Sequence, residues 1–419
     1  MTEQMKNSQE NQTSAPKLGR GTIAIIVAVF LVIGTVVVGY PYYQTYLAPW
    51  YEPVLTVRDS VYNMRYYMKI LRLHMTGSEK DKFGVTMRVI EKIQESALID
   101  QEAQKRKLTV SDEEITREVR RRVLEVGKGE GEFEDLYENL LRGLQLSKKF
   151  YSQIVKQDIY KAKLLNSFER ELSDTAEHIH IYGIVTGTAG KAEELRQRLR
   201  KGEDFKKIAR EESIDLSSSK KGGDFGWIPK GVDNRTVTEQ VHLLGILIKT
   251  KEDAETVKAR IEAGEDFTEL AKQVSMDDVS RPKGGYLGWI STQYQKGGKQ
   301  HAAESYELEP GSLSEPIDTG EGFWITKMLE KVPEGKLIDD HAFSLEVGRI
   351  TPPLSVLGRY YLIKVEAKEK RPLTQGNKRI LAEKALKNWL KDSAAKGSEE
   401  GWIKWNWGSE PLNWALNHL

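Results

Sequence analysis

The chain has 419 residues, of which 63 are Lys or Arg and 62 are Asp or Glu, so the formal net charge is +1. This length predicts about three domains, and the balanced charge argues against a basic surface for nucleic acid. The absence of cysteine excludes disulfides, thiolate catalysis and cysteine-ligated zinc. Nothing in the sequence predicts a cofactor or a bound metal.

The N-terminal region is typical of a membrane anchor. Residues 1–20 are polar and are expected to form a disordered cytoplasmic tail. The run from Thr22 to Gly39 has no charge and is followed by several Tyr and Trp residues. We therefore predict a transmembrane helix over 21–43, with the chain's bulk outside the cell membrane because the nearest bases precede the run. A cleaved signal peptide is the alternative, but the run is long and no A-x-A site follows it.

Residues 57–175 show helical periodicity. Apolar residues recur at helical spacing between Val61 and Met75, with Asp59 as the expected N-cap. Further helices are predicted over Val89–Ala103, after the capping box that begins at Ser111, and in two segments between 133 and 168. The sequence thus predicts an all-α region. Its Met- and Tyr-rich stripe is either a surface for apolar clients or, as we favour, a helical core.

The segment from Gly202 to Ile228 is repeated from Gly264 to Ile290. The repeat keeps one offset of 62 residues, as in the pairs Gly202/Gly264, Phe205/Phe267, Ser213/Ser275, Gly222/Gly284 and Trp227/Trp289. Each copy reads as strand, helix, short helix and strand, which is only half of a closed sheet. Such self-similarity indicates a duplicated unit.

The missing halves lie further along the chain. Tyr306–Lys327 and Phe343–Lys364 resemble each other at an offset of 37 residues. Two first halves are therefore followed by two second halves, and the simplest topology is nesting. We predict an inner domain over 237–336, inserted into an outer domain made of 177–236 and 337–370. A swapped pairing of the halves is the alternative, but it would tangle the connections.

The C-terminal segment combines a helix with tryptophans. A helix is predicted over Asn377–Asp392, and residues 396–419 form a tail that contains Trp402, Trp405, Trp407 and Trp414. Four tryptophans in a short tail will not remain in water. We expect them to dock on the chain's own body, with a client or a membrane surface as the alternatives.

The strings G-E-D-F, S-x-D and G-G-x-x-G-W, followed by L-x-x-G and I-x-K, resemble the parvulin (rotamase) family of peptidyl-prolyl isomerases. Residues 50–176 with 371–395 look like the helical chaperone domain of SurA-, PrsA- and PpiD-like foldases. The resemblance implies an α+β protein with two parvulin-like domains, each a four-stranded antiparallel sheet with helices. It also implies extracytoplasmic binding of unfolded or secreted polypeptides, Xaa-Pro segments included.

The sequence departs from the pattern of active parvulins at the residues that carry catalysis. Gly183 and Gly245 stand where the family has its first-strand histidine, and Tyr361 and Trp324 stand where it has the second. The family's acidic position is kept only by Asp278. His180 and His242 lie three residues before the lost positions, so we expect them on the opposite face of the strand.

These departures set the candidate residues. Asp278 is the candidate catalytic residue, although Asp at this point can simply cap a turn. The candidate substrate-binding residues are Trp324, Tyr361, Leu287, Phe323 and Phe343. The resemblance implies a membrane-anchored foldase or chaperone with isomerase activity weak or lost. The alternatives are an active isomerase that uses its inner domain and a non-catalytic envelope scaffold.

Overall fold

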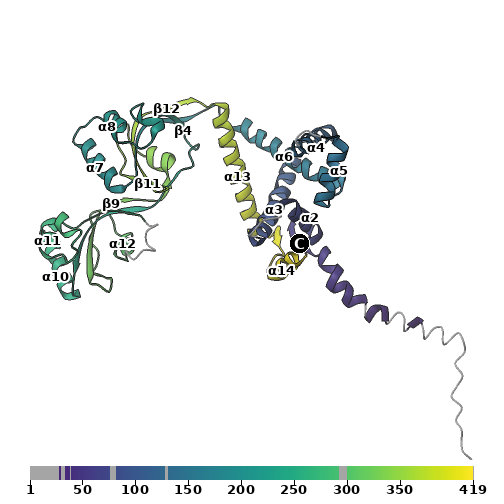
Figure 1. Cartoon of the computed structure of the whole chain (residues 1–419), viewed down its shortest axis with the longest axis horizontal. Helices are drawn as coiled ribbons and strands as arrows, with labels where there is room; N and C mark the ends of the chain where they lie inside the picture. Colours follow the sequence, from purple (N-terminus) through teal and green to yellow (C-terminus); the bar gives the residue numbers. More distant parts are fainter. Residues whose placement is uncertain are drawn as a thin grey trace, which may run out of the picture. The chain divides into compact units, whose positions relative to one another are not determined.

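The computed structural model describes residues 28–29, 34–37, 39–75, 82–127, 131–291 and 300–418. The chain divides into two compact units, Met1–Phe168 with Ala385–Leu419, and Glu169–Lys384, and each is described here by itself (Figure 1). Most of the predicted transmembrane run at 22–39 lies outside the described residues. Within the described ranges, no helix combines the length and the apolar character that a membrane crossing requires.

The first unit contains a small antiparallel sheet, so the prediction of an all-α region is wrong. Its strands β1 (Pro53–Val57), β2 (Ser60–Asn63) and β13 (Ile403–Trp405) lie in the order β13-β1-β2. β1 and β2 form a hairpin whose two-residue turn places Arg58 at a left-handed φ of 52°. Asp59 belongs to this turn and is not a helix cap.

The first helix of this unit consequently begins later than the apolar spacing suggests. α2 runs over Met64–His74, and its N-cap is Asn63, whose side chain accepts a hydrogen bond from the backbone N–H of Tyr66. Val61 lies on β2 and is exposed. Apolar residues at 61, 64, 68 and 71 also fit helical spacing, so local periodicity does not distinguish this strand from a helix.

The remaining helices of the unit agree with the sequence. They are α3 (Lys82–Lys105), α4 (Asp112–Val126), α5 (Phe133–Leu144) and α6 (Lys148–Glu171). The predicted capping box at Ser111 and Glu114 is confirmed, with both reciprocal hydrogen bonds present. Tyr67, Leu71 and Ile90 are fully buried in the core that these helices share with β1. The helical core interpretation of the Met- and Tyr-rich stripe therefore holds for its buried members.

The tryptophan-rich tail packs on the first unit. It follows α13 (Gln375–Glu399) and comprises β13 and α14 (Ser409–Asn417). The Trp407 ring lies 4.5 Å from the ring of Tyr67, and the Trp414 ring meets that of Trp50 edge-on at 4.8 Å. The expectation that the tail docks on the chain's own body is confirmed for these two residues.

The second unit contains two four-stranded antiparallel sheets of the same order, β11-β12-β3-β4 and β7-β6-β9-β8. The outer sheet consists of β3 (Thr175–Thr186), β4 (Asp224–Pro229), β11 (Leu354–Val356) and β12 (Arg359–Pro372). The inner sheet consists of β6 (Gln240–Ile248), β7 (Tyr286–Ser291), β8 (Ile317–Asp318) and β9 (Phe323–Val332). β12 pairs with β3, and β9 pairs with β6. This is the pairing that the nested order requires.

The two chain crossings between the sheets also pair with each other. β5 (Thr236–Val237) enters the inner domain and β10 (Gly335–Lys336) leaves it, and the two strands are antiparallel neighbours. The ends of the inserted segment therefore lie side by side, which is the condition under which an insertion is tolerated.

Duplicated helices cover one face of each sheet (Figure 1). They are α7 (Ala189–Arg200) and α8 (Phe205–Glu212) on the outer sheet, and α10 (Lys251–Glu262) and α11 (Phe267–Val274) on the inner sheet. The glycine and the aspartate of each G-E-D-F string have a structural role at the start of a helix. Gly202 and Gly264 take left-handed φ values of 94° and 100°, and Asp204 and Asp266 are the N-caps of α8 and α11.

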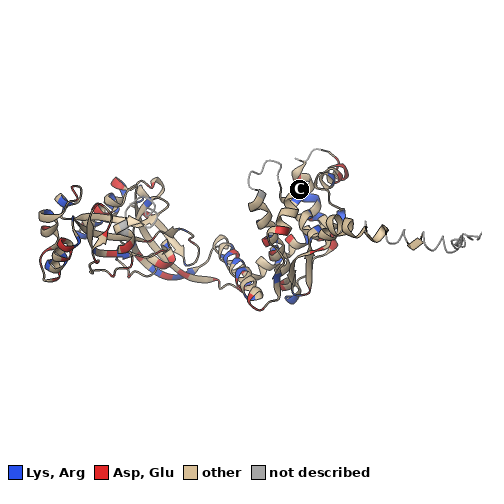
Figure 2. Cartoon of the chain, turned by 90° about the horizontal axis from the view of Figure 1, so that it is seen from below, with Lys and Arg blue, Asp and Glu red and all other residues tan. Residues whose placement is uncertain are grey.

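Shorter elements complete the unit. They are the turn α9 (Leu216–Ser219), the 3-10 turn η3 (Arg281–Lys283), the short helix α12 (Gln300–Ser305) and the π-helical segment η5 (Leu337–Ala342). Acidic and basic residues are interspersed over the elements of both units (Figure 2). This distribution agrees with the balanced composition of the chain.

Candidate functional site

The candidate site lies on the sheet face that the paired helices leave uncovered, around a glycine on the central strand of each sheet. In the inner sheet this residue is Gly245, on the central strand β6. A Cβ atom placed on it would lie 2.5 Å from Leu287 Cδ1 and 2.8 Å from Trp324 Cζ3. Real Cβ atoms do not approach neighbours this closely, so the space that a side chain would need is already filled.

Trp324 occupies the centre of the inner site. It pairs in register with Leu247 and is only 8% exposed, in a cluster with Leu247, Ile317 and Leu287. Its ring stacks on the imidazole of His301, with the ring centres 4.4 Å apart and the planes 18° from parallel. The structure thus brings together two predicted binding residues, Trp324 and Leu287, and adds a histidine from α12 that no sequence motif indicated.

The outer sheet repeats this arrangement with different side chains. Phe225 stands 62 residues before Leu287, and its ring would collide with any Cβ atom at Gly183. Tyr361 pairs with Val185, as Trp324 pairs with Leu247. The guanidinium of Arg235, on the segment that leads into the inner domain, lies 5.9 Å from the centre of the Phe225 ring and 5.6 Å from that of Tyr361.

The other two candidate aromatic residues lie in different places. Phe343 is half-buried in the outer domain, against the same hydrophobic cluster as Tyr361 and Phe225. Phe323 packs instead with Ile246, Ile248 and the α10 and α11 side chains, on the helix-covered face of the inner sheet. Adjacent strand residues point to opposite faces, so Phe323 cannot share a surface with Trp324. The structure therefore does not place Phe323 at the candidate site.

Asp278 is an exposed turn residue. Its carboxylate accepts a 2.6 Å hydrogen bond from Arg281, and its side chain is 83% exposed. The turn is capped by the preceding residue, Asp277, which accepts hydrogen bonds from the backbone N–H and the hydroxyl of Ser280. Asp215 caps the equivalent outer turn through Ser218. The duplicated acid is thus the Asp215/Asp277 pair, whose role is to hold the turn.

The histidines on the central strands belong to the opposite face, as parity predicts. His242 stacks on Trp289 with the ring centres 4.7 Å apart, and His180 stacks on Trp227 at 5.2 Å. The inner pair is buried, and the Trp289 indole N–H donates a 3.0 Å hydrogen bond to Glu193 on α7 of the outer domain. Burial lowers the pKa of His242 below its ordinary value.

Charged residues join the outer helix α7 to the inner strand β9. Arg196 is only 7% exposed, and its guanidinium pairs with the carboxylate of Glu330 at 2.8 Å and with that of Glu193 at 3.4 Å. Arg200 reaches Glu330 at 3.3 Å. We call Glu193, Arg196, Arg200 and Glu330 the interdomain charge cluster. Its position beside His242 and Trp289 makes this face of the inner sheet a structural contact between the domains.

The described residues contain no group of three or more His, Cys, Asp or Glu side chains that is arranged to hold a metal ion. The chemistry available at the candidate site is therefore that of aromatic and aliphatic side chains, one stacked imidazole in the inner domain and one stacked guanidinium in the outer domain. Such surfaces bind apolar and extended segments, and they offer few polar groups that could stabilise a reacting amide.

Comparison with known protein families identifies the domain types. A PPIC-type PPIase domain model matches residues 247–330, a second PPIC-type PPIase model matches 185–246, and a SurA-like N-terminal domain model matches 8–165. The 185–246 match includes neither β11 nor β12, which complete that sheet beyond the inserted domain. The chain therefore contains parvulin-type PPIase domains and a SurA-like N-terminal domain.

Individual relatives agree with these domain types. The chain is 36% identical over 110 residues to the foldase protein PrsA of Geobacillus sp. (strain WCH70), covering 26% of this chain and 39% of that protein. It is 29% identical over 197 residues to the chaperone SurA of Nitrosococcus oceani, covering 36% of this chain and 46% of the relative. Each match spans less than half of the relative's own length.

A solved structure of PrsA from Bacillus subtilis is 18% identical to this chain, and the alignment covers 87% of this chain and 98% of the PrsA chain. Its TM-score is 0.22, a value too low to support any argument about the arrangement of this chain.

Proposed function

We propose that this protein is a foldase-type chaperone that binds unfolded or newly translocated polypeptides, and that its prolyl isomerase activity is weak or lost. The single observation that supports a loss of activity is that neighbouring side chains already fill the space next to the two central-strand glycines. Phe225 occupies it at Gly183, and Leu287 with Trp324 occupies it at Gly245. The SurA-like and PPIC-type domain matches support the polypeptide-binding part.

The chemistry of proline isomerisation explains why the filling matters. The barrier to rotation about the peptide bond is about 18–20 kcal/mol and arises from amide resonance. A catalyst must seat the proline ring and stabilise the twisted amide more strongly than the planar one. In the inner domain, Trp324 and Leu247 are less than 10% exposed and take up the apolar surface that would otherwise seat a ring.

The proposal includes a membrane anchor, with the N-terminus in the cytoplasm and the bulk of the chain outside. It rests on the sequence, where 22–39 carries no charge and Lys17 and Arg20 precede it. An anchor would hold the chaperone where polypeptides emerge from the membrane. Protease protection in intact cells or spheroplasts tests it, since full resistance of 50–419 to external protease would contradict this orientation.

A second candidate function is isomerisation by the inner domain. It is favoured by one observation, the stacking of His301 on Trp324, which places an imidazole beside the strand where the family has its own histidines. Displacement of the Trp324 ring by a proline-containing segment would leave His301 next to the substrate.

Two assays on the purified full chain separate these functions. The first measures suppression of aggregation of an unfolded client without a slow proline step, and the second measures proline-limited refolding. We expect suppression in the first assay and little or no acceleration in the second. Acceleration that is lost in His301→Ala or Asp278→Ala would overturn the non-catalytic proposal. No effect in either assay would contradict the chaperone function and favour a scaffold.

A further inference from the structure

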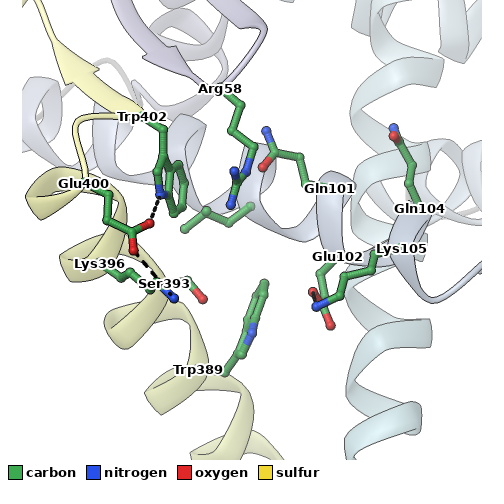
Figure 3. A pocket seen from close by; sticks show the side chains of 11 residues that line it. Arg58, Gln101, Glu102, Gln104, Lys105, Trp389, Ser393, Lys396, Glu400 and Trp402 are labelled. Carbon is green, nitrogen blue, oxygen red and sulfur yellow. Dashed lines mark hydrogen bonds and ion pairs between the residues drawn. The ribbon is translucent and has the colours of Figure 1, made fainter.

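The first unit contains a pocket with a volume of about 740 Å³ between α3, α13 and the β1–β2 turn (Figure 3). Two indole rings contribute to it, Trp389 from α13 and Trp402 from the segment that follows (Figure 3). Leu98 adds an almost fully buried aliphatic surface. This volume lies within the range of sites that bind compact ligands or a few residues of a peptide.

The pocket has one cation without an acidic partner. The guanidinium of Arg58 lies 4.0 Å from the centre of the Trp402 ring (Figure 3). Throughout the described part of the chain, no carboxylate lies within ion-pair distance of Arg58. Stacking on an indole holds the guanidinium in place and leaves its N–H groups at the plane's edge, where a carboxylate can accept two hydrogen bonds.

The acids of the pocket are already neutralised. Glu102 accepts a 2.8 Å hydrogen bond from Arg106, and Glu400 accepts a 2.9 Å hydrogen bond from the Trp402 indole N–H and pairs with Lys396 at 3.7 Å. The lining therefore holds more basic than acidic side chains, and the unpaired one is Arg58. A ligand that carries a carboxylate complements this charge.

The lining also offers amide groups that fit a peptide backbone. Gln104 is exposed at the pocket, and its side-chain amide has no hydrogen-bond partner among the described residues. Its side chain can donate to a main-chain carbonyl and accept from a main-chain N–H at the same time. Combined with two indole surfaces, this arrangement suits an extended polypeptide better than a small acid.

We infer that this pocket binds an acidic-apolar segment of a non-native polypeptide, in which a large apolar side chain enters between Trp389 and Trp402 and a neighbouring Asp or Glu carboxylate binds Arg58. This inference rests on the proposed chaperone function and specifies which segments of a client are selected. Basic-apolar segments of the same hydrophobicity bind more weakly, because Arg58 repels them.

A charge-reversal experiment tests the selection. Two dansyl-labelled decapeptides with the same apolar residues, one with Asp and one with Lys beside them, are titrated into the full chain. We expect the wild type to prefer the Asp peptide by about threefold to fivefold, as for partly exposed ion pairs. Arg58→Glu should invert this preference, and Arg65→Glu, an exposed arginine outside the pocket, should leave it unchanged. An unaltered preference in Arg58→Glu would overturn the inference.

The apolar part is tested with Trp389→Ala. We expect it to weaken binding of both peptides by about tenfold or more, as the loss of an aromatic anchor does. Trp405→Ala is the matched control, because Trp405 lies outside the pocket and is partly exposed. If the Trp389→Ala and Trp405→Ala variants bind the peptides equally well and both unfold at the wild-type temperature, the proposed binding of the apolar side chain at Trp389 is contradicted.

The outcomes distinguish this inference from the function on which it rests. If the wild type suppresses client aggregation but the Arg58 and Trp389 variants do so equally well and bind both peptides unchanged, only the pocket assignment fails. If the wild type neither suppresses aggregation nor binds either peptide, the chaperone function itself fails.

Discussion

The inner and outer sheets of the second unit have one strand order but differ in the side chains around their central glycine. The inner sheet places Trp324 there, under the imidazole of His301, and the outer sheet places Phe225 and Tyr361 there, under the guanidinium of Arg235. The turn glycines and the capping aspartates are the same in both. The two copies therefore share their turn and cap residues and differ in the side chains that cover this face.

The opposite faces differ as well. The His242–Trp289 pair of the inner sheet is buried against α7 of the outer domain, whereas the His180–Trp227 pair is partly exposed, with Arg371 over Trp227 at 4.2 Å. A duplicated surface has become an interdomain contact in one copy only. The two copies therefore have different structural roles.

The largest expected effect is at Arg196 in the interdomain charge cluster. Arg196→Ala leaves Glu193 buried without its cation, and breaking such a pair costs about 3–5 kcal/mol of unfolding free energy. The matched residue 62 positions later is Lys258 on α10, which pairs with the exposed acids Glu262 and Glu315. Lys258→Ala should cost less than about 1 kcal/mol. Urea unfolding checks both, and similar costs would refute the asymmetry.

A smaller effect is expected at the central glycine of the outer sheet. Gly183→Ala forces the Phe225 ring to move and should cost about 1–3 kcal/mol, as overpacking does. Gly187→Ala is the control, because no atom lies within 4 Å of its added Cβ. The double variant Gly183→Ala with Phe225→Ala should recover part of the loss. If thermal unfolding shows equal stability for the two alanine variants, the space at Gly183 is not filled.

A pH effect of similar or smaller size is expected from His242. Burial lowers its folded pKa below the ordinary value of 6.5, so the unfolded chain takes up the proton first as the pH falls. The stabilisation is complete above 6.5 and decreases below it, by at most about 1.4 kcal/mol per pH unit for one group. His242→Gln should flatten this dependence between pH 7 and 5. If the slope is unchanged in the variant, the pH response belongs to other groups, such as the half-buried His341, whose pKa is also lowered by burial.

The smallest effect is expected at Asp278. Its side chain is exposed and its partner Arg281 is also solvent-accessible, so Asp278→Ala should change the unfolding free energy by less than about 0.5 kcal/mol. Asp277→Ala removes the turn cap and should cost about 1 kcal/mol. Circular dichroism melts of the two variants compare them directly. A larger loss in Asp278→Ala would restore that residue as the structural acid of the turn.

Much of the second unit could be predicted from the sequence because its sequence segments are repeated at fixed offsets. The offsets of 62 and 37 residues identify the four half-domains, and the preference for untangled connections then predicts which strands pair. Parity is sufficient to assign His242 to the face opposite Gly245. The filled space at the glycines could not be predicted, because it depends on where the Phe225 and Leu287 side chains point. His301 was missed since α12 has no counterpart motif. The family pattern points to Asp278 and contains no information about Asp277, whose hydrogen bonds with Ser280 hold the turn.

The first unit was harder to predict where its contacts are distant in sequence. The β1–β2 hairpin is short, and its third strand, β13, comes from the C-terminal tail. Neither fact appears in local periodicity. The helices α3 to α6 each extend over at least 12 residues, which is long enough for apolar residues to recur at helical spacing, and the sequence predicts them correctly.

The central claim is that both parvulin-type sites are filled and do not catalyse proline rotation. Exchange NMR on a short Xaa-Pro peptide with the full chain tests it most directly, because it observes cis–trans interconversion without a folding client. We predict an exchange rate equal to that of the free peptide, for the wild type and for Trp324→Ala alike. Acceleration by the wild type that disappears in His301→Ala would contradict the claim and establish the inner domain as an isomerase.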